Sequence, residues 1–294
     1  MLGVLNLVLP KGSLEAATLK LFEEADLPVS RASDREYYAS IPDPRIAKVK
    51  ILRPQEIAQA VQQGHFDVGF TGHDWVLETG SDVHEVMNLR FNRGGMTVAR
   101  VILAVPGTST VERPEDIPEG WRISTEYLKL TRDYFDKLGK SVQVSLSYGA
   151  TEAKIPELAD AIVDLTETGT SLRRAGFRII ATLAETSTRM VANHQSWADP
   201  EKRQEIEEIQ TLLAGVLAAR GKVLIKMNVP ESRLQEIIGI LPAMKAPTIS
   251  RLFGTEYYAL ETVAVKAEIN LLIPKLKKHG AEDILELPIS KIVA

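Results

Sequence analysis

Residues 161–171 read Ala-Ile-Val-Asp-Leu-Thr-Glu-Thr-Gly-Thr-Ser, and this stretch has the pattern of a strand, a turn and a helix start in an α/β fold. The apolar strand ends at Asp164-Leu165, and a turn rich in hydroxyl groups follows, with Gly169 in its middle. Free amides at a helix start carry partial positive charge, and glycine lets the backbone approach an anion closely. The pattern predicts a cradle for a monophosphate. It is also typical of an ordinary capped helix, because Ser and Thr favour helix starts.

The side chains of this turn suit two parts of one ligand. The hydroxyl groups of Thr168, Thr170 and Ser171 can donate hydrogen bonds to a phosphate. The carboxylates of Asp164 and Glu167 do not suit a phosphate, but they accept hydrogen bonds from ribose hydroxyls. Phosphate and ribose together indicate a ribose 5-phosphate group.

Short apolar strands alternate with amphipathic helices on both sides of this turn. Strands are predicted at 5–9, 46–52, 66–70, 101–105, 122–124, 142–147, 161–165, 178–186 and 189–193. Helices are predicted at 14–25, 55–63, 74–78, 128–138, 171–175 and about 200–220. Buried strands followed by helices favour parallel sheets that are covered on both faces. We expect two α/β lobes around a cleft, with the last strand and the long helix returning to the first lobe.

The end of the chain has a different order of elements. Strands at 222–229, 247–252, 257–265 and 283–287 and helices at 231–241 and 267–279 form the ferredoxin-like βαββαβ pattern. The expected boundary is Arg220-Gly221. The predicted domains are a discontinuous first lobe (1–95 and 185–218), a second lobe (96–184) and a C-terminal domain (219–294).

The composition limits the class of protein. Of the 294 residues, 45% are hydrophobic and 25% are charged, as is usual for a globular protein with buried cores. The net charge of −4 gives no general attraction to nucleic acids, and the lack of cysteine excludes disulfides and thiolate metal sites. No apolar run approaches the roughly 18 residues that a membrane helix needs. The segment Met1–Leu9 has the pattern of a buried strand rather than a signal peptide, so we expect a soluble cytoplasmic protein.

A second phosphate candidate is Leu9-Pro-Lys-Gly-Ser13, which repeats the strand, glycine, hydroxyl and helix order. Lys11 adds a point charge, and Gly12 allows close approach of the backbone, so a pyrophosphate or triphosphate would suit this turn. A capped helix with a solvated lysine has the same pattern.

Further candidates follow other strands. Arg53 begins a helix at the carboxyl end of a predicted strand, where ligands bind in open α/β sheets, although a surface arginine fits equally. Gly72 and Asp74 lie in another such turn, where Asp74 could cap its helix or bind ligand. Arg100 and Glu152 are more typical of a surface. The five histidines show no metal spacing, and no G-x-G-x-x-G, G-x-x-x-x-G-K-[ST] or G-x-S-x-G motif occurs.

Taken in order, these segments resemble ATP phosphoribosyltransferase, the family that begins histidine biosynthesis. The resemblance spans nearly the whole chain, and the segments that carry it are Leu9–Ser13, Arg53–Ile57, Asp67–Gly72, Ala161–Ser171, Leu241–Thr248 and Gly280–Ile289. Each motif alone is weak, whereas the ordered set is highly specific.

The resemblance implies a two-lobed catalytic part similar to periplasmic binding proteins, followed by a regulatory domain. It also implies a reaction: N1 of the ATP adenine attacks C1 of phosphoribosyl pyrophosphate and displaces pyrophosphate, with Mg²⁺ present. Acids near the ribose and cations near the leaving group have the right polarity for this step. Because adenine N1 carries no proton, no strong general base is expected.

The resemblance also implies roles for the candidate residues. The catalytic residues would be Lys11, Arg53 and Glu167. The phosphoribosyl pyrophosphate site would comprise Asp164, Glu167, Thr168, Gly169, Thr170 and Ser171. The ATP or pyrophosphate site would comprise Lys11, Gly12, Arg53, Gly72, Asp74 and Arg100. We expect Mg²⁺ to be held mainly by substrate phosphates and assign it no protein ligand.

The C-terminal domain matches the long form of the family, which is similar to hexameric enzymes inhibited by L-histidine bound in this domain. The resemblance places that site at Asn228, Thr248, Ala281 and Asp283. Asn228 stands where many members carry an acid that could pair with the histidine amino group, and Glu282 and Asp283 supply acids nearby. A homo-oligomer, from dimer to hexamer, is expected.

Two other functions fit parts of the sequence. Two lobes around a cleft also suit a non-catalytic binding module, such as a solute receptor or a ligand-sensing regulator. Neither an export signal nor a basic recognition helix supports that alternative. A phosphoribosyltransferase with another nucleophile, such as a free base, would share the ribose 5-phosphate turn, but the C-terminal domain and the ordered motifs argue against it.

Overall fold

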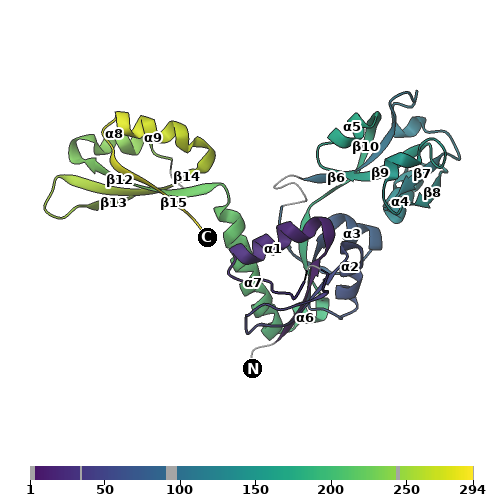
Figure 1. Cartoon of the computed structure of the whole chain (residues 1–294), viewed down its shortest axis with the longest axis horizontal. Coiled ribbons are helices and arrows are strands. Elements are labelled where there is room, and N and C mark those ends of the chain that lie inside the picture. The colour runs from purple at the N-terminus through teal and green to yellow at the C-terminus, as the bar shows by residue number, and fades with distance from the viewer. Residues whose placement is uncertain (1–3, 34, 91–97, 243–245, 294) are drawn as a thin grey trace. The chain divides into compact units, whose positions relative to one another are not determined.

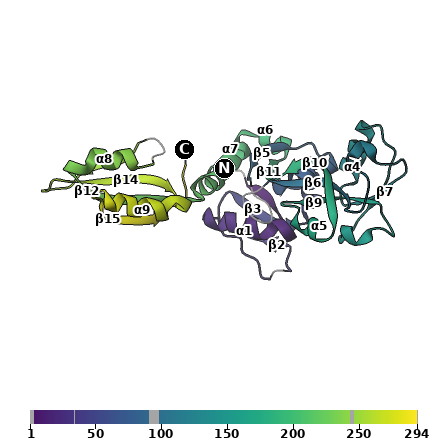
Figure 2. The same ribbon diagram turned by 90° about the horizontal axis from the view of Figure 1, so that it is seen from above.

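The computed structural model describes residues 4–33, 35–90, 98–242 and 246–293 (Figures 1 and 2). The chain divides into two compact units, Met1–Gln210 and Thr211–Ala294. The first unit contains two sheets, and the second contains one.

The first sheet is built from strands at both ends of the first unit. Its order is β2-β3-β1-β4-β11-β5. The strands are β1 (Leu5–Pro10), β2 (Tyr38–Ala39), β3 (Ile46–Leu52), β4 (Val68–Gly72), β5 (His84–Asn88) and β11 (Thr188–Ala192). Its helices are α1 (Glu15–Glu24), α2 (Pro54–Gln62) and α3 (His73–Thr79). The predicted return of the last strand is confirmed, because β11 pairs with β4 and β5.

The second sheet lies wholly within the middle of the chain. Its order is β10-β6-β9-β7-β8. The strands are β6 (Ala99–Pro106), β7 (Arg122–Thr125), β8 (Gln143–Leu146), β9 (Ala161–Thr166) and β10 (Phe177–Thr186). Its helices are α4 (Leu128–Lys137) and α5 (Thr170–Arg174).

The two sheets share one topology. In each, two strands run parallel to a central one, and a strand that arrives from the other sheet pairs antiparallel with its neighbours. That inserted strand is β11 in the first sheet and β6 in the second. The expectation of parallel sheets is therefore wrong in part, because each crossing strand runs against its neighbours and the edge strand β2 also pairs antiparallel with β3. The expected two-lobed α/β class is confirmed.

Apolar residues on alternate faces of the strands form the cores. In the first sheet, Phe70 packs edge-on against Phe22 of α1, with ring centroids 5.1 Å apart. The other face of β4 carries Gly69, where a Cβ would come within 2.7 Å of Ile57 and Val61 of α2. Glycine at this position therefore lets α2 approach the sheet closely.

A short helix and a long helix follow β11. They are α6 (His194–Ala198) and α7 (Pro200–Ala219), whose residues belong to the first unit up to Gln210. Asn193 caps α6 by accepting hydrogen bonds from the amides of Gln195 and Ser196.

The second unit has the predicted βαββαβ order. Its elements are β12 (Lys222–Pro230), α8 (Leu234–Ile240), β13 (Thr248–Arg251), β14 (Tyr257–Val265), α9 (Ile269–Lys278) and β15 (Glu282–Pro288). The sheet order is β13-β14-β12-β15, and all pairs are antiparallel. Both helices cover the same face of this sheet (Figure 1). The ferredoxin-like prediction is confirmed.

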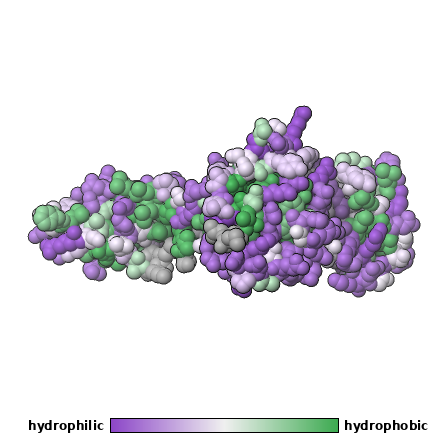
Figure 3. All heavy atoms as spheres, turned by 90° about the horizontal axis from the view of Figure 1, so that it is seen from below, coloured by the Kyte–Doolittle hydropathy of each residue, from purple (hydrophilic) through white to green (hydrophobic). Residues whose placement is uncertain are grey.

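Hydrophilic side chains dominate the face of the first unit that Figure 3 shows, and hydrophobic residues form smaller patches among them. Within the described parts of the chain, no helix is both long and apolar enough to cross a membrane.

Candidate functional site

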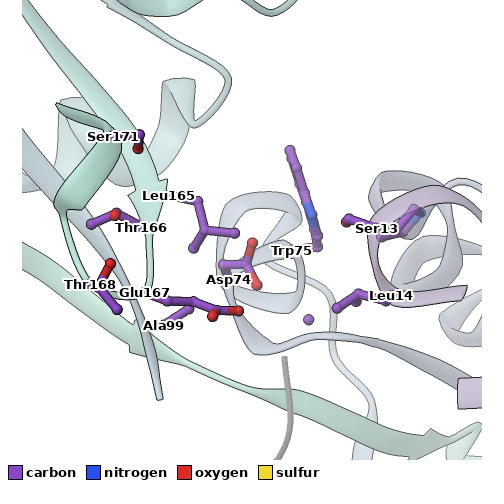
Figure 4. A pocket seen from close by; sticks show the side chains of 12 residues that line it. Ser13, Leu14, Asp74, Trp75, Ala99, Leu165, Thr166, Glu167, Thr168 and Ser171 are labelled. Atoms are coloured by element: carbon purple, nitrogen blue, oxygen red, sulfur yellow. The ribbon is translucent and has the colours of Figure 1, made fainter. Parts of the chain in front are cut away.

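A cavity of about 370 Å³ lies between the two sheets of the first unit (Figure 4). Its walls come mainly from the carboxyl ends of strands in both sheets and from the turns that follow them, and Ala99 adds the amino end of β6. Residues of the first sheet's side are Ser13, Leu14, Pro54, Gly72, Asp74 and Trp75. Residues of the second sheet's side are Ala99, Leu165, Thr166, Glu167, Thr168 and Ser171.

The turn after β9 has the conformation that the sequence indicates. Gly169 adopts φ +72° and precedes α5 directly. A Cβ there would lie 2.9 Å from Ile179, so both the backbone angle and the space require glycine. The Thr166 hydroxyl accepts a hydrogen bond from the Gly169 amide at 2.9 Å, and the Thr168 hydroxyl donates to Thr170 at 3.0 Å. The turn is thus preformed.

Arg173 is a cation of this turn that the sequence analysis missed. Its guanidinium folds back from α5 and donates to the Thr168 carbonyl at 3.0 Å and to the Thr170 hydroxyl at 3.3 Å. A Cβ at Gly169 would lie 3.1 Å from its Nη1. The spacing of four residues from Gly169 along a helix start could have indicated this contact.

The two acids of the turn differ in position. Glu167 lines the cavity, and Figure 4 shows its side chain reaching toward the Asp74 side. Asp164 is half-buried and does not line the cavity, and its Oδ1 accepts from the Leu165 amide at 2.7 Å. Thr168 and Ser171 also line the cavity, whereas Gly169 and Thr170 form the backbone of the turn behind them.

Asp74 lines the opposite wall, and both of its carboxylate oxygens already accept hydrogen bonds. Tyr127 Oη donates to Oδ2 at 2.7 Å, and Thr186 Oγ1 donates to Oδ1 at 2.6 Å. Burial, and then the charge of Asp74, raise the pKa of Tyr127 well above its usual value, so its hydroxyl keeps its proton. Gly72 is required here, because a Cβ would overlap the Asp74 carboxylate.

The turn after β1 reaches the cavity with other residues than predicted. Ser13 and Leu14 line it, but Lys11 and Gly12 do not. The Gly12 amide donates to Glu15 Oε2 at 3.0 Å, and Arg31 pairs with that carboxylate at 2.6 Å. The Lys11 ammonium lies 4.1 Å from the centre of the Tyr37 ring. The Glu15 carboxylate therefore accepts the hydrogen bond of the Gly12 amide, which the sequence suggested as a donor to a bound anion.

Arg53 lines a second cavity, of about 420 Å³, which shares Trp75 with the first. Its other residues are Gln55, Glu78, Thr79, Glu126, Leu128, Leu146, Ser147 and Tyr148. Trp75 thus separates the two spaces, and it is an aromatic residue that the sequence analysis did not select. Arg100 and Glu152 line neither cavity; Arg100 lies on β6, opposite Thr166 of β9.

Ser147, which lines the second cavity, accepts a hydrogen bond from the side chain of Lys154. Lys154 Nζ donates to Ser147 Oγ at 2.7 Å, and Ser147 and Thr151 share a hydrogen bond of 3.1 Å. No local motif marks this pair, because the contact depends on how the turn of 3₁₀ helix at Thr151–Lys154 folds back.

In the second unit, some residues of the predicted histidine site lie together, and one lies apart from them. Asn228 Nδ2 donates to Asp283 Oδ2 at 2.8 Å, and Ala281 is buried beside them in the core of this unit. Thr248 is exposed on β13, at the opposite edge of the sheet from β15. Residues 243–245 of the Leu241–Thr248 motif lie outside the described residues.

The part of the chain that the structure describes contains no group of three His, Asp or Glu side chains placed to hold a metal ion. The carboxylates on the walls of the first cavity are those of Asp74 and Glu167, on opposite sides. Oxygen donors of this kind suit Mg²⁺ that keeps most of its ligands from phosphate and water.

Comparisons with known proteins point to one family. The family model described as HisG, ATP phosphoribosyltransferase, matches residues 53–215, and the HisG C-terminal domain model matches residues 219–291. An ATP phosphoribosyltransferase of Chlorobium phaeovibrioides is 46% identical over 290 residues, which cover 99% of this chain and 98% of that protein. One of Desulforudis audaxviator is 42% identical and covers 98% of this chain and 99% of that protein. The solved ATP phosphoribosyl transferase (HisG:HisZ) complex from Thermotoga maritima matches with a TM-score of 0.61 and 25% identity, over 71% of this chain and 98% of that chain.

Proposed function

The chain belongs to the ATP phosphoribosyltransferase family, and from this premise we propose how its cavities divide the reaction. The enzyme joins N1 of ATP to C1 of phosphoribosyl pyrophosphate, releases pyrophosphate and so performs the first step of histidine biosynthesis. The observation that carries the proposal is the cavity between the two sheets, which has the preformed turn after β9 on one wall.

This turn binds the phosphoribosyl donor in our proposal. Thr168 and Ser171 face the cavity with hydroxyl donors for the 5-phosphate, and Arg173 supplies the positive charge that sequence reasoning lacked. Glu167 faces the same cavity and suits the ribose hydroxyls or the positive charge that develops on the ring. Asp164 does not line the cavity, so in our proposal it acts on the donor indirectly, from behind the turn.

In our proposal, ATP and the leaving pyrophosphate bind on the first sheet's side, opposite the turn after β9. Arg53 offers a fork of donors to phosphate oxygens in the second cavity, and the face of Trp75 borders both spaces. Lys11 and Arg100 stand outside both cavities, so their proposed contact with phosphates requires a side chain that swings inward. Adenine N1 carries a free lone pair and no proton, so the attack needs no base. Positioning of the two substrates therefore supplies much of the rate enhancement.

Mg²⁺ fits this arrangement as a companion of the substrates. It would neutralise charge on the departing pyrophosphate, and Asp74 and Glu167 are the carboxylates near enough to the cavity to assist. The protein's own part is to hold the donor turn, the arginine and the aromatic wall in place.

Regulation is assigned to the second unit. L-histidine is proposed to bind near Asn228, Ala281 and Asp283 and to inhibit turnover, and Thr248 would reach this site from another copy of the chain in a homo-oligomer of two to six subunits. The contact between Asn228 and Asp283 supports a polar site at this edge of the sheet. We propose that the reaction takes place in the cytoplasm.

A turnover assay combined with binding measurements tests the donor assignment. Purified protein with ATP, phosphoribosyl pyrophosphate and Mg²⁺ should form phosphoribosyl-ATP and pyrophosphate. In the double variant Thr168→Ala/Ser171→Ala, the Kd for phosphoribosyl pyrophosphate should rise roughly tenfold or more, as expected for two lost hydrogen bonds to a charged group. The Kd for ATP should hardly change. An equal loss for both substrates would exclude this turn as the donor site.

A further inference from the structure

Helix α3 joins the two sheets of the first unit through its carboxylates. Glu78 accepts hydrogen bonds from the amides of Lys129 and Leu130, each at 2.9 Å, at the start of α4. Such amides have no partner within their own helix and carry partial positive charge, so an acid from another element stabilises them. The end of α3 is thereby fixed to the second sheet's side.

The start of α3 is fixed to the same side by Tyr127, the residue before α4. Its hydroxyl donates to Asp74, and its ring stacks on Trp75 with centroids 4.8 Å apart and an angle of 29°. Tyr127 is 2% exposed and Asp74 is 3% exposed, so water does not compete for this hydrogen bond.

The crossing strand holds α3 from a third direction. Thr186, the last residue of β10, donates to Asp74 Oδ1 at 2.6 Å and accepts from the Asp74 amide at 3.0 Å. The next residue, Ser187, accepts from the His73 amide at 3.0 Å. Asp74 therefore links α3 to the residue before α4 and to the end of β10, where the chain crosses between the two sheets.

We propose that Tyr127 and Thr186 are positioning residues for phosphoribosyl transfer, because they fix the wall made by Asp74, which lines the first cavity, and Trp75, which lines both cavities. Neither of them lines a cavity, so each acts through residues that do. The inference rests on the proposed division of substrates between the cavities. A displaced wall would misplace both substrates, whereas a change in the donor turn would affect one.

The variant Tyr127→Phe tests this role, since it keeps the stacked ring and removes only the hydroxyl. The value of kcat/KM should fall about tenfold or more for each substrate, the range expected for a lost hydrogen bond to a charged group. Tyr134→Phe is the matched control: Tyr134 lies on α4 and packs against the same core, and its hydroxyl has no hydrogen-bond partner among the described residues. It should keep the wild-type kcat/KM. An unchanged Tyr127→Phe, or an equal loss in Tyr134→Phe, would overturn the proposal.

Thr186 supplies a second test, in which a conservative variant that keeps the hydroxyl should also keep the activity. Thr186→Val removes the hydroxyl and should lose activity like Tyr127→Phe, whereas Thr186→Ser keeps the hydroxyl and should stay within about threefold of wild type, a change of under 1 kcal/mol. Equal activity of the two variants would contradict a role for the hydrogen bond.

A fluorescence measurement separates this inference from the assignment of substrates. In a Trp121→Phe/Trp197→Phe background, Trp75 is the remaining tryptophan of the three in the chain. Tyr127→Phe and Thr186→Val should change its emission maximum or its quenching by acrylamide, and Tyr134→Phe should not. Altered emission with full activity would show that the wall moves without consequence, and unaltered emission would show that it is not held by these hydroxyls; both results reject the proposal.

Discussion

At the scale of single residues, glycines and buried acids decide the shape of the cleft. Gly169 provides a backbone angle that the turn needs, and Gly72 provides room for the Asp74 carboxylate. The first requirement is local and was visible in the sequence. The second was not, because the side chain that fills the space is held there by Tyr127 and Thr186.

Gly72→Ala should therefore disturb the wall without straining the backbone, since Gly72 has an ordinary φ of −70°. The new Cβ forces Asp74 to move, so we expect a loss of about 1 to 3 kcal/mol in the free energy of unfolding, the usual cost of overpacking. Urea denaturation of the full chain measures it. The control is Gly239→Ala, on helix α8, where a Cβ would meet no atom within 4 Å. That change should be neutral or stabilising by up to about 1 kcal/mol. Equal stability of Gly72→Ala and wild type would show that Asp74 adapts freely.

At the scale of elements, a partly buried ion pair attaches the end of the first unit to its first sheet. Asp67 precedes β4 and accepts from the Asn6 amide at 2.7 Å, from Ser196 Oγ at 2.6 Å and from Lys202 Nζ at 2.6 Å. Burial alone would raise the pKa of Asp67, but these three donors outweigh it and lower the pKa below the usual 3.8. Helices α6 and α7 are thus bound to β1 and β4.

This contact predicts a pH-dependent stability. Because the folded pKa of Asp67 is lowered, its carboxylate stabilises the fold fully above 3.8, and the contribution is lost as the pH falls below that value. Asp67→Asn should lower the free energy of unfolding by roughly 1 to 3 kcal/mol at neutral pH, since it weakens the hydrogen bonds to a buried carboxylate while the partly exposed Lys202 is still solvated. Denaturation curves of both proteins at neutral and acidic pH should converge on acidification. A difference that is independent of pH would contradict the assigned charge.

The elements themselves were largely predictable, and the exceptions have physical causes. The strand β5 was missed because its residues His84–Asn88 lack an apolar run and its order comes from pairing with β11. The expected helices near 231 and 267 begin as 3₁₀ turns, at Glu231–Arg233 and Lys266–Glu268. Helix ends of this kind are common, and periodicity does not distinguish them.

At the scale of the whole molecule, one chain combines a catalytic unit with a C-terminal unit that has its own core. The predicted domain boundaries inside the first unit stay a prediction. The proposed coupling between the units can be measured without knowing their arrangement, because a ligand of the second unit should change turnover in the first.

L-histidine should inhibit turnover, and Asp283→Asn should raise the concentration for half-inhibition about tenfold, since it removes a charged partner for the ligand's amino group. Turnover without histidine should stay at the wild-type value. The matched control is Glu286→Gln on the same strand, whose side chain pairs with Lys266 instead. Inhibition by millimolar histidine that is equal in all three proteins would exclude Asp283, and no inhibition at all would mean that this unit serves another ligand.

The sequence by itself determined most of the order of elements, the turn at 161–171, the βαββαβ end and the family, because all of these depend on local patterns and on ordered motifs. Only the tertiary structure decided which candidates meet. It placed Arg53 in one cavity and Glu167 in another, left Lys11 outside both, and joined Asp74 to Tyr127 and Thr186, which lie 53 and 112 residues away along the chain. Contacts over such separations follow from how the two sheets pack, and no spacing rule within the sequence encodes them.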